Sequence, residues 1–184
     1  MLNSRMEGTG IATLKRNKYW ILVGIYVAVI YTTLSWMPTL VEWAGWGFRY
    51  RLGFIVSMFL ILILGRYVFY LFFEKKVRRL SSWFLIFSVM AAYGYLLNIL
   101  WIPQEKLHLF EYGFLAFLVY KALKSDVRDG RIYLYTSILV ASFGCVDELI
   151  QFFLPNRYYD LKDMSVNVAS GVMGAITLYA RDRG

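Results

Sequence analysis

The only histidine of the chain, His108, lies three positions before Glu111 in the apolar stretch HLFEYGFLAFLVYKAL, residues 108–123. A spacing of three places both side chains on one face of a helix. An imidazole beside a carboxylate can transfer protons, supply two ligands to a metal ion, or form a buried hydrogen-bonded link between helices. The residues leave these readings open, but no second histidine completes a ligand set, so we expect no metal and no cofactor.

Two later segments carry polar residues at helical spacing. Glu148 and Gln151 lie three positions apart just before Pro155, and Asp163 precedes Asn167 by four positions. Asp147 points about 100° away from Glu148 around a helix, which leaves its role open.

These polar residues form one stripe on each of three predicted helices. At a rise of about 1.5 Å per residue, His108, Glu111, Glu148 and Asn167 all lie roughly 8–12 Å below one surface. A polar stripe in hydrocarbon must face another helix or a wet cavity, because exposed charge there is costly. We therefore expect the stripes to face one another. Ser170-x-x-x-Gly174, with Gly171 beside it, adds a small-residue face that permits close helix packing.

Two basic residues flank this layer. Lys106 and Arg157 could attract a phosphate or carboxylate, or they could only neutralise nearby acids such as Asp160 and Glu105. The candidate ligand-binding residues are Lys106, His108, Glu111, Glu148, Gln151, Arg157, Asp163 and Asn167.

The amino-acid composition predicts that these residues fold in a lipid bilayer rather than in water. The chain has 184 residues, of which 59% are hydrophobic and 19% aromatic, far outside the range of soluble proteins. Apolar runs long enough to cross a bilayer lie near residues 19–37, 53–73, 83–101, 105–123, 132–154 and 164–180. The sequence thus predicts an all-α integral membrane protein, a polytopic bundle of about six transmembrane helices.

The basic residues predict the orientation of this bundle. With the N-terminus inside, 14 of the 20 Lys and Arg residues fall in cytoplasmic segments and only five in outer ones, which predicts cytoplasmic N- and C-termini. The net charge of +8 is therefore mainly a topology signal. Because the basic residues are dispersed over four segments, we expect no nucleic-acid partner.

Three segments together resemble the VanZ-like membrane family. They are QEKLHLFEYGFLAFLVYKAL, DELIQFFLPNR and YDLKDMSVNVASGVMG, and the resemblance covers roughly residues 100–180 in the same order. It implies a multi-pass protein of the bacterial cytoplasmic membrane, with an N-terminal two-helix region at 1–82 and a VanZ-like four-helix region at 83–184. The family is named for a protein linked to low-level resistance to the glycopeptide antibiotic teicoplanin.

Three function classes remain. The polar layer could bind an amphiphile from the outer leaflet, either a lipid-linked envelope component or a lipophilic glycopeptide-type antibiotic. It could instead serve an intramembrane enzyme acting on a lipid headgroup, with His108, Glu111 and Glu148 as acid, base or metal ligands. Against an enzyme stands the lack of a recognisable nucleophile. The third class is a scaffold, in which the polar layer only holds helices together.

Overall fold

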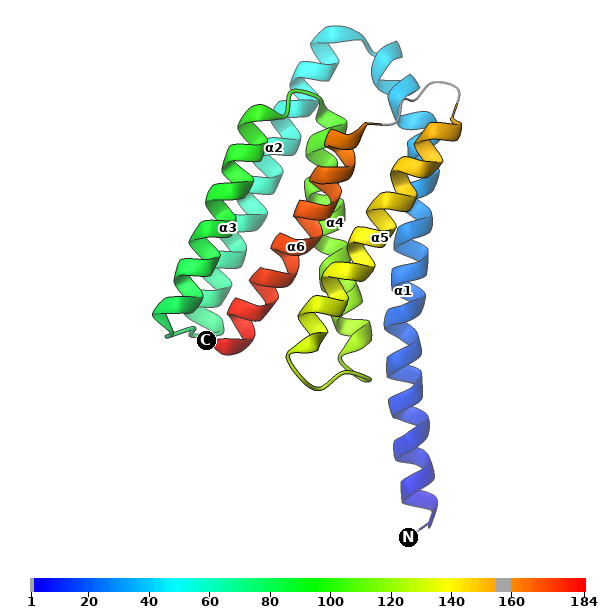
Figure 1. Cartoon of the computed structure of the whole chain (residues 1–184), viewed down its shortest axis with the longest axis vertical. Helices are drawn as coiled ribbons and strands as arrows, with labels where there is room; N and C mark the ends of the chain where they lie inside the picture. The colour runs from blue at the N-terminus through cyan, green and yellow to red at the C-terminus, as the bar shows by residue number, and fades with distance from the viewer. Residues whose placement is uncertain (1, 155–159) are drawn as a thin grey trace.

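The chain folds into long helices that run up and down in one bundle (Figure 1). The computed structural model describes the backbone of residues 2–154 and 160–184, and the side chains from Lys18 onward except at positions 34, 35, 37, 38, 41 and 46. Its elements are α1 (Leu2–Trp43), α2 (Gly45–Phe69), a π-helical turn η1 (Tyr70–Glu74), α3 (Leu80–Ile99), α4 (Pro103–Leu123), α5 (Arg131–Phe153) and α6 (Leu161–Arg183). The described residues contain no strand.

Local sequence explains where several helices begin. Gly45 has a φ of 80° at the junction of α1 and α2, a left-handed conformation that glycine adopts without a steric penalty. Pro103 occupies the first turn of α4, where its missing N–H is not needed. Asp160 caps α6, because its Oδ1 accepts a hydrogen bond from the backbone N–H of Lys162 at 2.8 Å.

Each of the six predicted spans overlaps one of the long helices, but their limits differ, and the spans at 83–101 and 132–154 extend past the ends of α3 and α5. The largest difference is in α1, which has 42 residues and a length of about 63 Å, twice the hydrocarbon thickness of about 30 Å. Its N-terminal part extends beyond the other helices (Figure 1). The predicted limit at residue 19 marks the start of the apolar run, whereas the helix itself continues through the polar residues before it.

Among the described residues, three helices are long and apolar enough to cross a membrane, namely Gly47–Glu74, Leu80–Ile99 and Arg131–Phe153. A shorter apolar helix covers Lys18–Thr33. Helices α4 and α6 do not reach this level, because they carry most of the polar residues discussed above. Large apolar side chains remain exposed over the bundle, including Phe54, Leu62, Phe84 and Phe152, as expected of a surface that faces lipid.

Helix α4 forms the centre of the bundle and contacts α1, α2, α5 and α6. Helix α6 packs on α4, α5 and α3. Small residues allow these close approaches: a Cβ on Gly174 would lie 2.7 Å from Ala116 Cβ, and one on Gly171 would lie 2.5 Å from Val140 Cγ1. The predicted small-residue face of α6 is therefore its contact surface with α4 and α5.

Candidate functional site

His108 and Glu111 form a hydrogen-bonded pair on the inward face of α4. The Nδ1 atom of His108 lies 3.0 Å from Oε2 of Glu111. The imidazole is buried, and the carboxylate is partly exposed. His108 is also close enough to Asp147 of α5 and Asp163 of α6 to interact with both electrostatically. The pair therefore belongs to a cluster that extends over three helices.

Helix α5 contributes three buried polar side chains. Gln151 Nε2 donates a hydrogen bond to Glu148 Oε1 at 2.8 Å, and the other oxygen of Glu148 accepts from the backbone N–H of Asp160 at 3.3 Å. Asp147, whose role the sequence left open, is fully buried, and its Oδ2 accepts from Asn167 Nδ2 at 3.4 Å. Because α5 is packed between neighbours, residues 100° apart on this helix can both be buried.

A glycine lets α6 bring Asn167 to this position. A Cβ on Gly144 would lie 2.8 Å from Asn167 Cβ, so the close approach requires glycine at 144. One turn further along α6, Ser170 Oγ donates a hydrogen bond to the carbonyl of Leu109 at 2.9 Å. These contacts fix α6 between α4 and α5 at the depth of the histidine.

An ion pair closes the cluster at the start of α6. Lys162 Nζ lies 2.8 Å from Glu105 Oε1, whose side chain is 4% exposed, whereas that of Lys162 is 49% exposed. Lys162 lies before the predicted span at 164–180. Its hydrogen bond to the Glu105 carboxylate raises the pKa of the Lys162 ammonium group. Asp163, the next residue, lies within electrostatic range of both His108 and Glu105.

The structure brings together six of the eight predicted ligand-binding residues: His108, Glu111, Glu148, Gln151, Asp163 and Asn167. Lys106 does not join them, because its Nζ reaches Ser57 Oγ of α2 at 3.0 Å. Arg157 lies outside the described residues.

Five contributors were absent from the eight predicted residues, namely Glu105, Asp147, Lys162, Tyr112 and Tyr31. Lys162 takes the neutralising role that the sequence offered to Lys106 and Arg157. Tyr112 is fully buried and interacts with Asp147, and Tyr31 of α1 also lies near Asp147 while its hydroxyl donates to the carbonyl of Phe143 at 2.9 Å. The spacing of Tyr112 four positions after His108 was a usable signal, whereas no spacing links α1 to this cluster.

We refer to Glu105, His108, Glu111, Asp147, Glu148, Gln151, Lys162, Asp163 and Asn167 as the acidic cluster. It combines five carboxylates with one lysine and one histidine. Three of its acceptor atoms, Glu105 Oε2, Asp163 Oδ1 and Asn167 Oδ1, are buried without a hydrogen-bond partner among the described residues. Such an arrangement can bind hydrogen-bond donors or cationic groups, or exchange protons.

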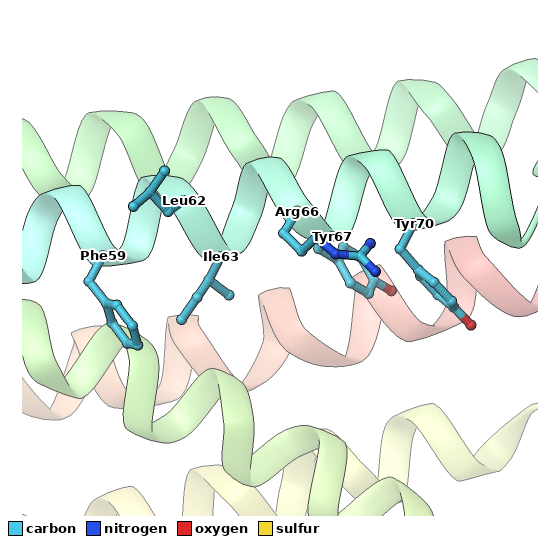
Figure 2. A pocket seen from close by; sticks show the side chains of 6 residues that line it. All are labelled: Phe59, Leu62, Ile63, Arg66, Tyr67 and Tyr70. Carbon is cyan, nitrogen blue, oxygen red and sulfur yellow. The ribbon is translucent and has the colours of Figure 1, made fainter.

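The described residues include no group of three or more His, Cys, Asp or Glu side chains arranged to hold a metal ion. The structure also contains a hollow of about 540 Å³ along α2, lined by Phe59, Leu62, Ile63, Arg66, Tyr67 and Tyr70 (Figure 2). Its arginine pairs with Glu74 Oε1 at 2.7 Å, and neither residue belongs to the acidic cluster.

Comparison with known proteins identifies the part of the chain that carries this cluster. A search of curated proteins and a search of solved structures gave no match. Residues 93–181 match the family model described as VanZ/LLP1. This region includes α4, α5, most of α6 and the last part of α3. Over residues 93–181, just under half of its length, the chain is VanZ-like.

Proposed function

We propose that the chain is a multi-pass protein of the bacterial cytoplasmic membrane, with six spans and both termini in the cytoplasm. The up-and-down order of the helices supports this arrangement, because the α2–α3 and α4–α5 connections and the C-terminus lie at one end (Figure 1). The predominantly basic segments of the sequence are at that end. Helices α4 and α6 can cross lipid despite their polar stripes, since neighbouring helices bury those stripes.

We further propose that the acidic cluster binds the polar head of an amphiphile from the outer leaflet. The observation that carries this proposal is the excess of acceptors: five carboxylates face one lysine and one histidine, and three buried acceptor atoms have no partner among the described residues. Buried acceptors of this kind are costly unless a donor satisfies them. The matching ligand carries amine, amide or hydroxyl donors.

Two classes of amphiphile fit this description and the family relationship. One is a lipid-linked component of the cell envelope, whose sugar and amide groups supply donors. The other is a lipophilic glycopeptide-type antibiotic, which would connect the cluster to antibiotic resistance. Both reach the cluster from the outer side of the membrane under the proposed topology.

A scaffold role is the second candidate. The near-complete burial of Asp147, Glu148, Gln151 and Asn167, each at most 1% exposed, favours this role, because a closed network can simply fix the helices.

The cellular test compares neutral, nearly isosteric replacements. Glu148→Gln and His108→Gln should change sensitivity to a membrane-anchored glycopeptide while the protein accumulates to its normal level. Arg66→Gln is the control, because Arg66 pairs with Glu74 outside the acidic cluster. Unchanged sensitivity in both cluster variants at normal protein level would contradict antibiotic binding.

A further inference from the structure

Another hollow, distinct from the one along α2 in Figure 2, lies beside the start of α4, on the side of Lys106. Its volume is about 430 Å³, and it is bounded by α2, α3 and the first turn of α4. Its lining residues are Arg49, Tyr50, Gly53, Phe54, Ser57, Leu97, Asn98, Leu100, Trp101 and Lys106. We call it the α2–α3 pocket.

The charge of the α2–α3 pocket is opposite to that of the acidic cluster. Its described lining includes two cations, Arg49 and Lys106, and no carboxylate. Lys106 Nζ donates to Ser57 Oγ at 3.0 Å, while Ser57 in turn donates to the carbonyl of Gly53 at 2.8 Å. The ammonium group therefore has a neutral hydroxyl as its hydrogen-bond partner, and a bound anion would add the opposite charge.

The remaining walls suit an acyl chain. Leu97, Leu100 and Phe54 are apolar, and Phe54 is 61% exposed at the surface. Tyr50 and Trp101 are 81% and 86% exposed beside the cations. Amphipathic aromatic rings of this kind favour the headgroup layer of a bilayer. The pocket thus joins an anion-binding corner to an apolar, lipid-facing wall.

We propose that the α2–α3 pocket binds the phosphate headgroup of an anionic glycerophospholipid, such as phosphatidylglycerol. The guanidinium of Arg49, the ammonium of Lys106 and the amide of Asn98 supply donors for the phosphate oxygens. The acyl chains lie against Phe54 and Leu97. The proposed topology assigns this lipid to the outer leaflet. This site is separate from the acidic cluster, and nothing in the proposed amphiphile binding requires it.

Fluorescence of Trp101 tests this proposal locally. The other five tryptophans are replaced by phenylalanine, and the full-length chain is reconstituted in phosphatidylcholine nanodiscs. Quenching of Trp101 by brominated phosphatidylglycerol is compared with quenching by brominated phosphatidylcholine. We expect a preference for phosphatidylglycerol of about fivefold for each basic residue that contacts the headgroup.

Three variants assign the preference to the pocket. Lys106→Gln should lower it by about fivefold, Lys106→Arg should retain it, and Arg128→Gln, in the exposed α4–α5 loop, should leave it unchanged. Equal quenching by the two lipids in the parent protein, or an unchanged preference in folded Lys106→Gln, would overturn the proposal. If the single-tryptophan protein fails to fold, native mass spectrometry of the unaltered chain and Lys106→Gln measures the same preference as retained phosphatidylglycerol.

Competition with inorganic phosphate distinguishes a lipid-binding site from a site for soluble phosphate. Inorganic phosphate in molar excess over the lipid should leave the quenching by brominated phosphatidylglycerol in place, because the acyl chains contribute to lipid binding. Complete displacement by inorganic phosphate would show a site for soluble anions and would overturn the assignment to a lipid.

Discussion

At the first turn of α4, two neighbouring residues of opposite charge point to different sides of the helix. Glu105 contacts Lys162 of α6, whereas Lys106 contacts Ser57 of α2. One turn of helix thereby separates an acidic cluster from a cationic pocket.

The Glu105–Lys162 pair predicts an asymmetric response to neutral replacement. Lys162→Gln leaves the buried carboxylate of Glu105 without its cation and should lower the free energy of unfolding by about 1–3 kcal/mol. Glu105→Gln leaves an ammonium that is half exposed and can be hydrated, so its effect should be smaller. The unfolding temperatures of the purified variants in detergent show which of the two replacements destabilises the protein more. Lys162→Arg is the charge-preserving control. The reverse order would contradict the burial on which this prediction depends.

Spacing in the sequence was sufficient to predict most members of the acidic cluster. His108 and Glu111, like Glu148 and Gln151, share a helical face, and the cost of polar groups in lipid requires such faces to meet. The direction of Lys106 was not predictable in this way. Lys106 lies in the first turn of α4, and the neighbour of its side chain depends on where α2 and α6 cross α4. Tertiary packing, rather than local spacing, sets these crossings.

At the scale of elements, glycines on α6 let this helix pack closely against α4 and α5. Gly171 faces Val140 of α5, and Gly174 faces Ala116 and the carbonyl of Gly113 on α4. The sequence predicted a small-residue face but not its partners, because glycine spacing marks close packing without naming the helix that approaches. The close approach also holds Asn167 and Ser170 at the acidic cluster.

Added methyl groups on this face should push the helices apart. Gly171→Ala and Gly174→Ala place a Cβ within 2.5 Å and 2.7 Å of Val140 Cγ1 and Ala116 Cβ, and each should destabilise the protein by about 1–3 kcal/mol. Gly94→Ala is the matched control, because nothing lies within 4 Å of its added Cβ and alanine favours a helix. Equal unfolding temperatures for the three variants would contradict the described packing.

The helices themselves were largely predictable, whereas their limits were not. Apolar runs marked each of the six long helices, but α1 begins well before its apolar run. A hydrophobic run measures the part of a helix that suits lipid, while hydrogen bonding along the backbone continues until a residue such as Gly45 ends it.

At the scale of the whole molecule, the two ends of the bundle differ in charge. The buried carboxylates of the acidic cluster lie toward the end where α4 and α6 begin, and the basic connections lie at the opposite end (Figure 1). Of these two features, the bias of Lys and Arg toward one end is the one that sets the orientation in a membrane. Both proposed binding sites lie at the same end of the bundle.

Cysteine labelling tests that orientation. In a background in which Cys145, the single cysteine, is replaced by alanine, Leu161→Cys at the start of α6 should react in intact cells with an impermeant reagent. Ser125→Cys in the α4–α5 loop should react only after the cells are opened. Both positions are exposed in the structure, so the side of the membrane decides the outcome. Labelling of Ser125→Cys alone in intact cells would reverse the proposed topology.

The central claim, that the acidic cluster binds a donor-bearing amphiphile, is tested most directly by native mass spectrometry of the purified protein. The unaltered chain should retain such an amphiphile, and Glu148→Gln should retain at least about tenfold less, since a hydrogen bond to a charged group contributes about 1.5–3 kcal/mol. The unfolding temperature of Glu148→Gln should fall modestly, because an amide NH2 replaces one of the two oxygens that accept hydrogen bonds from Gln151 and Asp160, so retention is compared at a temperature where both proteins are folded. Phosphatidylglycerol whose retention is lost in Lys106→Gln is assigned to the α2–α3 pocket and is not counted as a ligand of the acidic cluster. Equal retention by the unaltered chain, His108→Gln, Glu111→Gln and Glu148→Gln would contradict binding at the cluster and leave the scaffold role.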